Sequence, residues 1–172
     1  MLKPQDLLVA IQVALWRGRA WRYEDLSHSL GLSQSESHKA VARAQDAGLL
    51  VGRRADRGAL LEFIEHGVRR AFYTKRGPSS RGVPTGAGAP PLNRQLSSSE
   101  IPVWPHSEGR ARGYAIKPLY KSVPKAALED PELYEALALL DAIRDGGARE
   151  RRLAMKALRE RLGQVRPGEN SS

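Results

Sequence analysis

The stretch that decides the fold runs from Tyr23 to Leu50 and reads YEDLSHSLGLSQSESHKAVARAQDAGLL. Its beginning predicts a short helix, because two leucines four positions apart would share the buried side. Gly31 then allows a sharp turn, since glycine tolerates a positive φ. A second helix is predicted to start at Ser33, because Ser33 and Glu36 make the Ser-x-x-Glu pattern of a capping box, which would satisfy two free amides reciprocally. This order of elements predicts a helix-turn-helix.

The second helix, predicted over residues 33–47, has one apolar and one polar face. Ala40, Val41 and Ala44 would pack inward, and Gly48 is a suitable end. Glutamine, serine and lysine side chains on the other face can hydrogen-bond the edges of base pairs in the major groove of DNA. The residues expected to face the groove are Gln34, Ser35, His38 and Lys39.

Residues 20–52 resemble the winged helix-turn-helix of MarR-type bacterial regulators. The resemblance rests on the Leu-Gly-Leu-Ser turn at 30–33, on the Ser-rich second helix and on the Ala-Gly-Leu-Leu ending at 47–50. It implies a transcriptional regulator that places the second helix in the major groove of double-stranded DNA. A looser resemblance, to winged-helix antitoxins that repress their own operons, rests on the second helical module that follows the helix-turn-helix.

The sequence departs from the MarR-type pattern in three residues of the helix-turn-helix and in the segment that follows it. Arg22 stands where a capping Ser or Thr is expected, Ser37 occupies a position that is usually apolar, and Ala44 replaces a leucine. In addition, the two strands of a wing are not apparent directly after Leu50, because a short helix is predicted from 58 to 66. We therefore expect a later hairpin and a basic loop to take the place of the wing.

Arginines near the second helix are expected to hold the DNA backbone, because most protein–DNA hydrogen bonds go to phosphate and sugar. One of them lies on the helix itself, three follow it, and two belong to a more distant basic loop. The predicted phosphate contacts are Arg43, Arg53, Arg54, Arg57, Arg76 and Arg81. The alternative is that the helix and these arginines form an ordinary solvated face.

The charge of the chain favours a polyanionic partner. The 172 residues include 28 Lys and Arg against 19 Asp and Glu, a net charge of +9. Residues 75–128 carry most of this excess, with nine basic and two acidic side chains. Within them, residues 75–99 are rich in Gly, Pro and Ser and are predicted to form a long mobile loop, which is either a solvated linker or a polyanion-binding arm.

The rest of the pattern is mainly helical with a few short strands. Leucine spacing predicts a helix from Pro4 to about Gly18. Strands are predicted at 68–73, 101–104 and 111–117, the last two as a hairpin. Aromatic and basic residues are interleaved in and after this hairpin. They form either the core of a small sheet, which we favour, or a surface that stacks on unpaired bases.

The end of the chain predicts two helices that share an apolar seam and are separated by Gly146 and Gly147. The expected fold class is therefore mainly α with a small antiparallel β-sheet: a winged helix-turn-helix plus a C-terminal helical hairpin. The predicted parts are a helix-turn-helix domain (1–74), the basic loop (75–99), a β-hairpin that completes the sheet (100–123), a helical module (124–165) and a disordered tail (166–172).

Several classes of function are disfavoured. The chain has no cysteine, which removes disulfides, thiolate metal sites and cysteine nucleophiles and suits the reducing cytoplasm. No apolar run approaches 18 residues and the N-terminus lacks a signal-peptide layout, so we expect a cytoplasmic protein without membrane contact. No catalytic or cofactor-binding motif is present. The four histidines lack the spacing of a metal site: His28, His38, His66 and His106.

These patterns lead to one main expectation and two alternatives. We expect a sequence-specific DNA-binding protein, a transcriptional regulator without enzymatic activity or cofactor. The C-terminal helices are expected to join two copies into a homodimer, which would predict a palindromic site. The first alternative is an antitoxin or another protein-binding module whose C-terminal helices hold a partner enzyme. The second is an RNA-binding protein.

Overall fold

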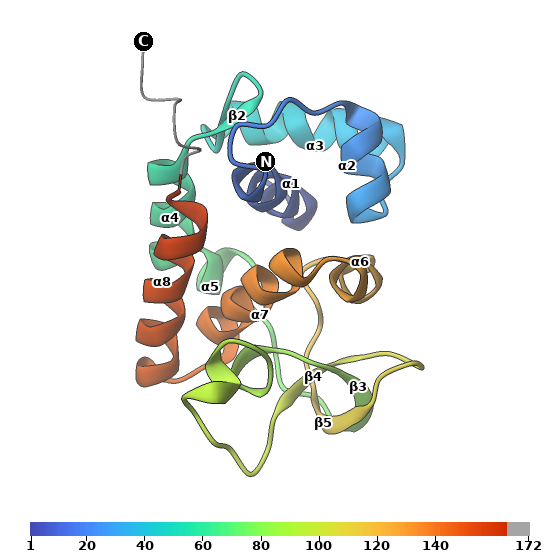
Figure 1. The fold of residues 1–172 in the computed structure, drawn as a ribbon, viewed down its shortest axis with the longest axis vertical. Coiled ribbons are helices and arrows are strands. Elements are labelled where there is room, and N and C mark those ends of the chain that lie inside the picture. The colour runs from blue at the N-terminus through green and yellow to red at the C-terminus, as the bar shows by residue number, and fades with distance from the viewer. Residues whose placement is uncertain (165–172) are drawn as a thin grey trace.

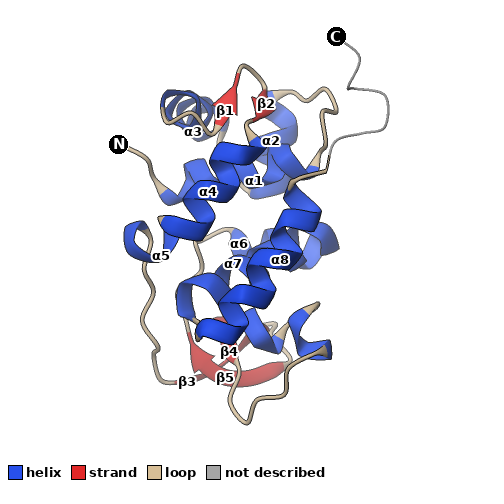
Figure 2. Cartoon of the chain, turned by 90° about the vertical axis from the view of Figure 1, so that its left-hand side faces the viewer, coloured by secondary structure: helices blue, strands red, loops and turns tan. Residues whose placement is uncertain are grey.

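The computed structural model describes residues 1–164, and α-helices carry most of them (Figure 1, Figure 2). The tail predicted at 166–172 lies outside the described residues. The expected fold class is confirmed. The helices are α1 (Pro4–Leu15), α2 (Tyr23–Leu30), α3 (Gln34–Asp46), α4 (Arg57–His66), α5 (Val68–Ala71), α6 (Val123–Glu129), α7 (Pro131–Asp145) and α8 (Ala148–Leu162). The strands are β1 (Leu50–Val51), β2 (Arg54–Ala55), β3 (Ser79–Pro84), β4 (Pro102–Pro105) and β5 (Ala111–Ala115).

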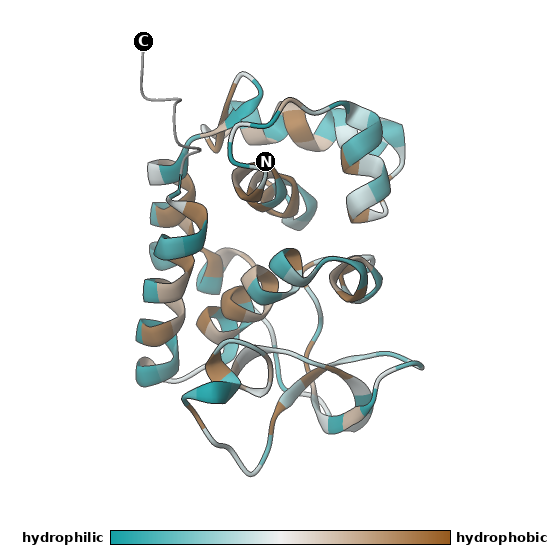
Figure 3. Cartoon of the chain, in the orientation of Figure 1, coloured by the Kyte–Doolittle hydropathy of each residue, from teal (hydrophilic) through white to brown (hydrophobic). Residues whose placement is uncertain are grey.

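Two central helices, α1 and α7, are buried along most of their length. Every residue of α1 from Asp6 to Leu15 is buried, and so is every residue of α7 from Ala136 to Arg144. The helix α8 packs against α7, α4 and α1, so the predicted C-terminal hairpin closes on the helix-turn-helix half of the chain. Figure 3 shows the alternation of apolar and polar residues along these helices. The buried seam of α8 consists of Ala154, Met155, Leu158 and Leu162.

A two-stranded hairpin directly follows α3. Its strands, β1 and β2, pair antiparallel, and the turn between them contains Gly52, whose φ of +61° suits a residue without a Cβ. Our expectation that no wing strands follow Leu50 directly is therefore wrong. Strands of two residues are too short to show the alternation by which a strand is recognised in a sequence.

The second sheet lies at the opposite end of the molecule from α3 (Figure 1). The strand β3 pairs antiparallel with β4 and with β5, while β4 and β5 pair parallel, so that each strand contacts the other two. Three expectations are corrected here. The segment 75–99 contains β3 and two short 3-10 turns, β4 and β5 do not form an antiparallel hairpin, and the strands in 100–123 build a separate sheet with β3.

Glycine explains why this segment is ordered and not a mobile loop. A Cβ on Gly82 would lie 2.1 Å from the backbone oxygen of Trp104, and a Cβ on Gly113 would lie 2.0 Å from that of Ile101. Any side chain at these positions would push the strands apart, so the glycines permit the close backbone approach that closes the sheet. Composition alone does not separate this use of glycine from flexibility.

The strand predicted at 68–73 is also wrong, because α5 forms a single helical turn there. The backbone N–H of Ala71 donates to the carbonyl of Gly67 at 2.9 Å, and Val68 is buried against the core. A short apolar run is consistent with either a strand or a buried helical turn, and packing decides between them.

A hydrogen-bonded polar cluster joins the second sheet to α7. We call Thr85, Trp104, Asp141 and Arg144 the Asp141 cluster. The Asp141 carboxylate accepts from Thr85 Oγ1 at 2.7 Å, from Trp104 Nε1 at 2.6 Å and from Arg144 Nη1 at 2.8 Å. Burial raises the pKa of Asp141, against the opposing effect of the Arg144 guanidinium and the other donors. Because Trp104 is completely buried, it belongs to the core of the sheet and is not exposed to stack on bases.

The environment of Tyr134 leads us to expect that the protein loses stability at alkaline pH. Its hydroxyl donates to the carbonyl of Pro84, and burial raises its pKa to about 12. The unfolded chain ionises tyrosine near pH 10. This group therefore contributes stability that is complete below about pH 10 and is lost as the pH rises towards 12. Urea unfolding between pH 8 and 11.5 should show a shallower decline for Tyr134→Phe than for the parent protein. The exposed Tyr73 provides the control, since Tyr73→Phe should leave the decline unchanged.

Candidate nucleic-acid interface

The start of α3 is set by local hydrogen bonds. Gly31 adopts φ +67°, and Ser33 Oγ accepts from the N–H of Glu36 at 3.0 Å. The predicted capping box is only half formed, because the Glu36 carboxylate does not return to Ser33. It accepts instead from the Tyr120 hydroxyl at 2.9 Å, which ties α3 to the segment before α6.

The unusual serine inside the helix-turn-helix has its polar group satisfied. Ser37 is completely buried, and its hydroxyl lies 2.9 Å from that of Ser27 on α2 and donates to the carbonyl of Ser33 at 2.9 Å. A buried hydroxyl is tolerated when it is hydrogen-bonded. The two serines thus replace an apolar contact between α2 and α3 with a polar one.

The outward side of α3 carries the residues that the sequence predicted. They are exposed and lie one helical turn apart in pairs. The helix that carries them, α3, lies at the end of the molecule opposite to β3–β5 (Figure 1). Within residues 1–164, none of their side chains takes part in an ion pair or a side-chain hydrogen bond. His38 is held by stacking on Tyr23, with ring centroids 3.6 Å apart. We call this set the recognition face: Gln34, Ser35, His38 and Lys39.

Arg43 has a different position from the one predicted. Its Nε donates to both carboxylate oxygens of Asp6, at 3.0 and 2.9 Å, and Asp6 is completely buried. Only 22% of the Arg43 side chain is exposed, and the hydrogen bond to Asp6 raises its pKa. Arg43 therefore fastens α3 to α1, a role that the sequence did not indicate. The buried partner is 37 residues away in the chain, so local spacing gave no sign of it.

The wing is held beside α3 by an aromatic clamp that sequence reasoning missed. The Arg53 guanidinium lies 4.2 Å from the ring centroid of Trp21 and 5.1 Å from that of Tyr23. Backbone contacts reinforce it: Trp21 Nε1 donates to the carbonyl of Arg53, and Arg53 Nη2 donates to that of Trp21, both at 2.8 Å. Gln45 Nε2 on α3 donates to the carbonyl of Gly52 at 2.7 Å. Arg53 is thus oriented next to the recognition face.

Further cations surround the clamp. Arg54 is exposed on β2, and Arg57 is half-buried at the start of α4, with no hydrogen-bond partner for its Nε within the described chain. Two more exposed arginines precede α2 and were not predicted: Arg19, whose guanidinium lies 4.8 Å from the Trp16 ring, and Arg22. Their closeness to Trp21 in the sequence is the feature from which they could have been predicted.

The two remaining predicted arginines lie far from this surface. Arg81 is exposed on β3, at the end of the molecule opposite to α3 (Figure 1). Arg76 is paired with Asp145 of α7, with Nε 3.0 Å from the carboxylate, and its guanidinium lies 4.5 Å from the Tyr114 ring. The structure therefore does not bring these two residues together with the recognition face, and the basic segment is not an arm beside α3.

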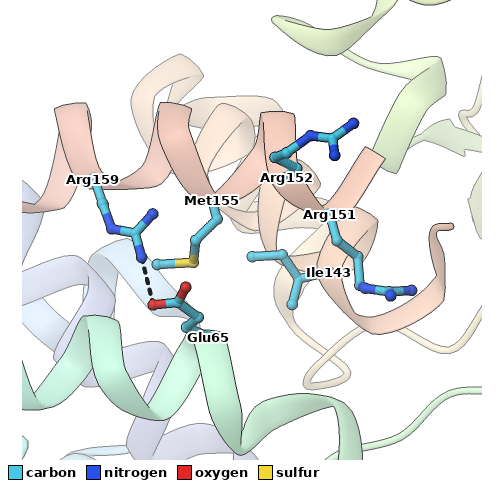
Figure 4. A pocket seen from close by; sticks show the side chains of 6 residues that line it. All are labelled: Glu65, Ile143, Arg151, Arg152, Met155 and Arg159. Atoms are coloured by element: carbon cyan, nitrogen blue, oxygen red, sulfur yellow. Dashed lines mark hydrogen bonds and ion pairs between the residues drawn. The ribbon is translucent and has the colours of Figure 1, made fainter. Parts of the chain in front are cut away.

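A hollow between α4, α7 and α8 contains an ion pair between Glu65 and Arg159 beside the apolar Met155 and Ile143 (Figure 4). Across residues 1–164, no group of three histidine or acidic side chains is placed to hold a metal ion. No helix in the same range is both long and apolar enough to cross a bilayer.

Comparisons of the chain with protein-family models, with curated proteins and with solved structures gave no match.

Proposed function

We propose that this protein binds double-stranded DNA in a sequence-specific manner and regulates transcription, as the MarR-type proteins it resembles do. The observation that carries the proposal is the recognition face. Four polar side chains point outward from the second helix of a helix-turn-helix, and Arg53 in the turn of the wing is oriented beside them. Stacking on Trp21 and Tyr23 holds the Arg53 cation next to these side chains, which favours an anionic partner for this surface.

The side chains of the recognition face suit base-edge contacts. Gln34 can pair bidentately with adenine, Lys39 can donate to the acceptors of guanine, and Ser35 can bond either. Arg54 and Arg57 would then contact the phosphates that flank the groove. In this arrangement α3 supplies sequence preference, and the wing supplies most of the local attraction to the backbone.

A regulator of this kind commonly binds as a dimer, with two half-sites about one DNA turn apart. We propose that contact between copies uses the C-terminal helices. Because the apolar seam of α8 is buried within the chain, such a contact would use its charged outer side. The absence of cysteine and a role on DNA favour the cytoplasm as the compartment.

Selection from a pool of random duplexes tests the proposal directly. The purified chain should enrich a common motif, and it should bind a selected duplex about 10³-fold or more tightly than a scrambled one at physiological salt. Fluorescence anisotropy measures both affinities. No enrichment and no binding at low salt would refute the proposal, and so would a preference for structured RNA over every duplex.

Substitutions of Arg43 and Arg54 should have opposite effects, because we expect Arg43 to stabilise the fold and Arg54 to bind phosphate. Arg43→Ala leaves the buried Asp6 carboxylate without its cationic partner, so unfolding should become easier by about 1–3 kcal/mol. The salt dependence of duplex binding should stay unchanged. Arg54→Ala should leave stability within about 0.5 kcal/mol and reduce the slope of log K against log salt by about 0.9. Urea unfolding and anisotropy titrations at several salt concentrations check both, and the reverse pattern would show that the assignments are exchanged.

A further inference from the structure

Three arginines gather on the second sheet, away from the recognition face. Arg81 on β3 stands directly opposite Arg112 on β5 in the antiparallel register, and Arg110 lies two residues before Arg112. All three are exposed, and within residues 1–164 none of them forms an ion pair. The nearest acidic residue in the sequence, Glu108, is exposed and forms no ion pair within the same range.

This placement has an energetic cost in the isolated chain. Like charges directly opposite on neighbouring strands destabilise a sheet. Elsewhere in the chain the arginines Arg43, Arg144 and Arg159 each contact a carboxylate, so acidic partners are available to this fold. Arg81 and Arg112 face each other without a carboxylate partner. An anion from outside the chain that neutralised their charges would explain this arrangement.

The three arginines line one hollow together with Gly109 and Ala111. Gly109 cannot carry a side chain here, because its Cβ would lie 2.3 Å from the backbone of Gly82. Gly109 therefore lies directly against the backbone of β3, beside the three arginines that line the hollow. Planar guanidinium groups bind phosphate oxygens bidentately.

The lining indicates which phosphate-bearing partner fits. A site for a small ligand is usually lined mainly by apolar and aromatic side chains, and a protein-binding hot spot is usually built on aromatic anchors. Neither is present around these arginines. An open hollow that offers charge and no large apolar side chain suits a nucleic-acid backbone, which is bound mainly by cations and without reading of sequence.

We propose that Arg81, Arg110 and Arg112 form a second binding site, which holds the phosphate backbone of a duplex other than the one on α3. The two sites lie at opposite ends of the molecule (Figure 1), so a single chain would bridge two DNA segments. The bridging part rests on the proposed function, whereas the phosphate contact itself does not.

The test uses two variants that each remove three positive charges from the full chain. The first is Arg81→Gln with Arg110→Gln and Arg112→Gln. The matched control is Arg70→Gln with Arg94→Gln and Lys125→Gln, three exposed cations outside α8 and the second sheet that form no ion pair within the described residues. A third variant, Gln34→Ala with Lys39→Ala, removes the α3 contacts.

The readouts are duplex binding and bridging. On a duplex of random sequence, the slope of log K against log salt should fall by about 2.7 for the first variant, because each phosphate left without its arginine reduces it by about 0.9. The slope should remain unchanged for the control. A bead-bound duplex should retain a second, labelled duplex with the parent protein and the control, and not with the first variant. The melting temperature of the first variant should not decrease, because opposed charges are removed.

Three outcomes would overturn the second site: an equal slope for the parent and the first variant, an equal decrease in the control, or tighter binding of polyglutamate than of duplex to the parent protein. Failure of the proposed function looks different. In that case the α3 variant behaves like the parent on every duplex, while the arginine variant still loses its salt dependence.

Discussion

Asp141→Ala is expected to lower the free energy of unfolding by about 3–5 kcal/mol, because it leaves a buried cation without its counter-charge. The Arg144 side chain is only 4% exposed, so water cannot replace the carboxylate. The same change removes the acceptor of Thr85 Oγ1 and of Trp104 Nε1, two further buried donors. Urea unfolding followed by circular dichroism measures the loss.

A double variant shows that the effect comes from the pair. Arg144→Met added to Asp141→Leu should cost clearly less than the sum of the single changes, because neither charge is left alone in the core. If Asp141→Ala does not fold, Thr85→Val can be used in its place, because it removes one hydrogen bond to Asp141 and keeps the ion pair with Arg144. If the stability losses of the two single variants simply add up in the double variant, Asp141 and Arg144 act independently.

The recognition face predicts the largest effect on binding. Gln34→Ala with Lys39→Ala should weaken binding to a selected duplex by about 2–6 kcal/mol, since each base contact is worth about 1–3 kcal/mol. Binding to a scrambled duplex should change far less, because only Lys39 carries a charge. The preference between the two duplexes should therefore collapse, as measured by anisotropy.

A matched control removes the same residue types elsewhere. Gln95→Ala with Lys125→Ala deletes an exposed glutamine and an exposed lysine outside the helix-turn-helix and α8, and should leave both affinities as they were. Stability should be unaffected in either variant, because all four side chains are exposed. An unchanged preference in the first variant would remove α3 from the interface.

Local signals predicted the helix-turn-helix well. The helices expected from Tyr23 and from Ser33 begin within one residue of the observed α2 and α3, and Gly31 adopts the positive φ that the turn needs. Capping, glycine turns and the 3.6-residue period act between residues that are close in the chain, so a single sequence displays them. For the same reason the exposed residues of α3 could be named in advance.

Contacts between distant residues could not be predicted in this way. Arg43 is a basic residue on an amphipathic helix, and nothing near it indicates that Asp6 lies buried beneath it. The clamp of Arg53 on Trp21 joins residues 32 apart, and Asp141 meets Thr85 across 56. The end at which Arg76 and Arg81 lie depends on how the second sheet packs on α7.

The sequence by itself thus determined the helix-turn-helix, its recognition face and the basic character of the segment after it, because these follow from local periodicity, capping and composition. Only the tertiary structure decided which arginines are free. Pairing with a buried carboxylate ties Arg43 to α1, stacking on aromatic rings orients Arg53, and the register of β3 with β5 leaves Arg81 and Arg112 opposed at the far end. Charge can be counted along a chain, but its availability depends on which side chains folding brings within contact distance.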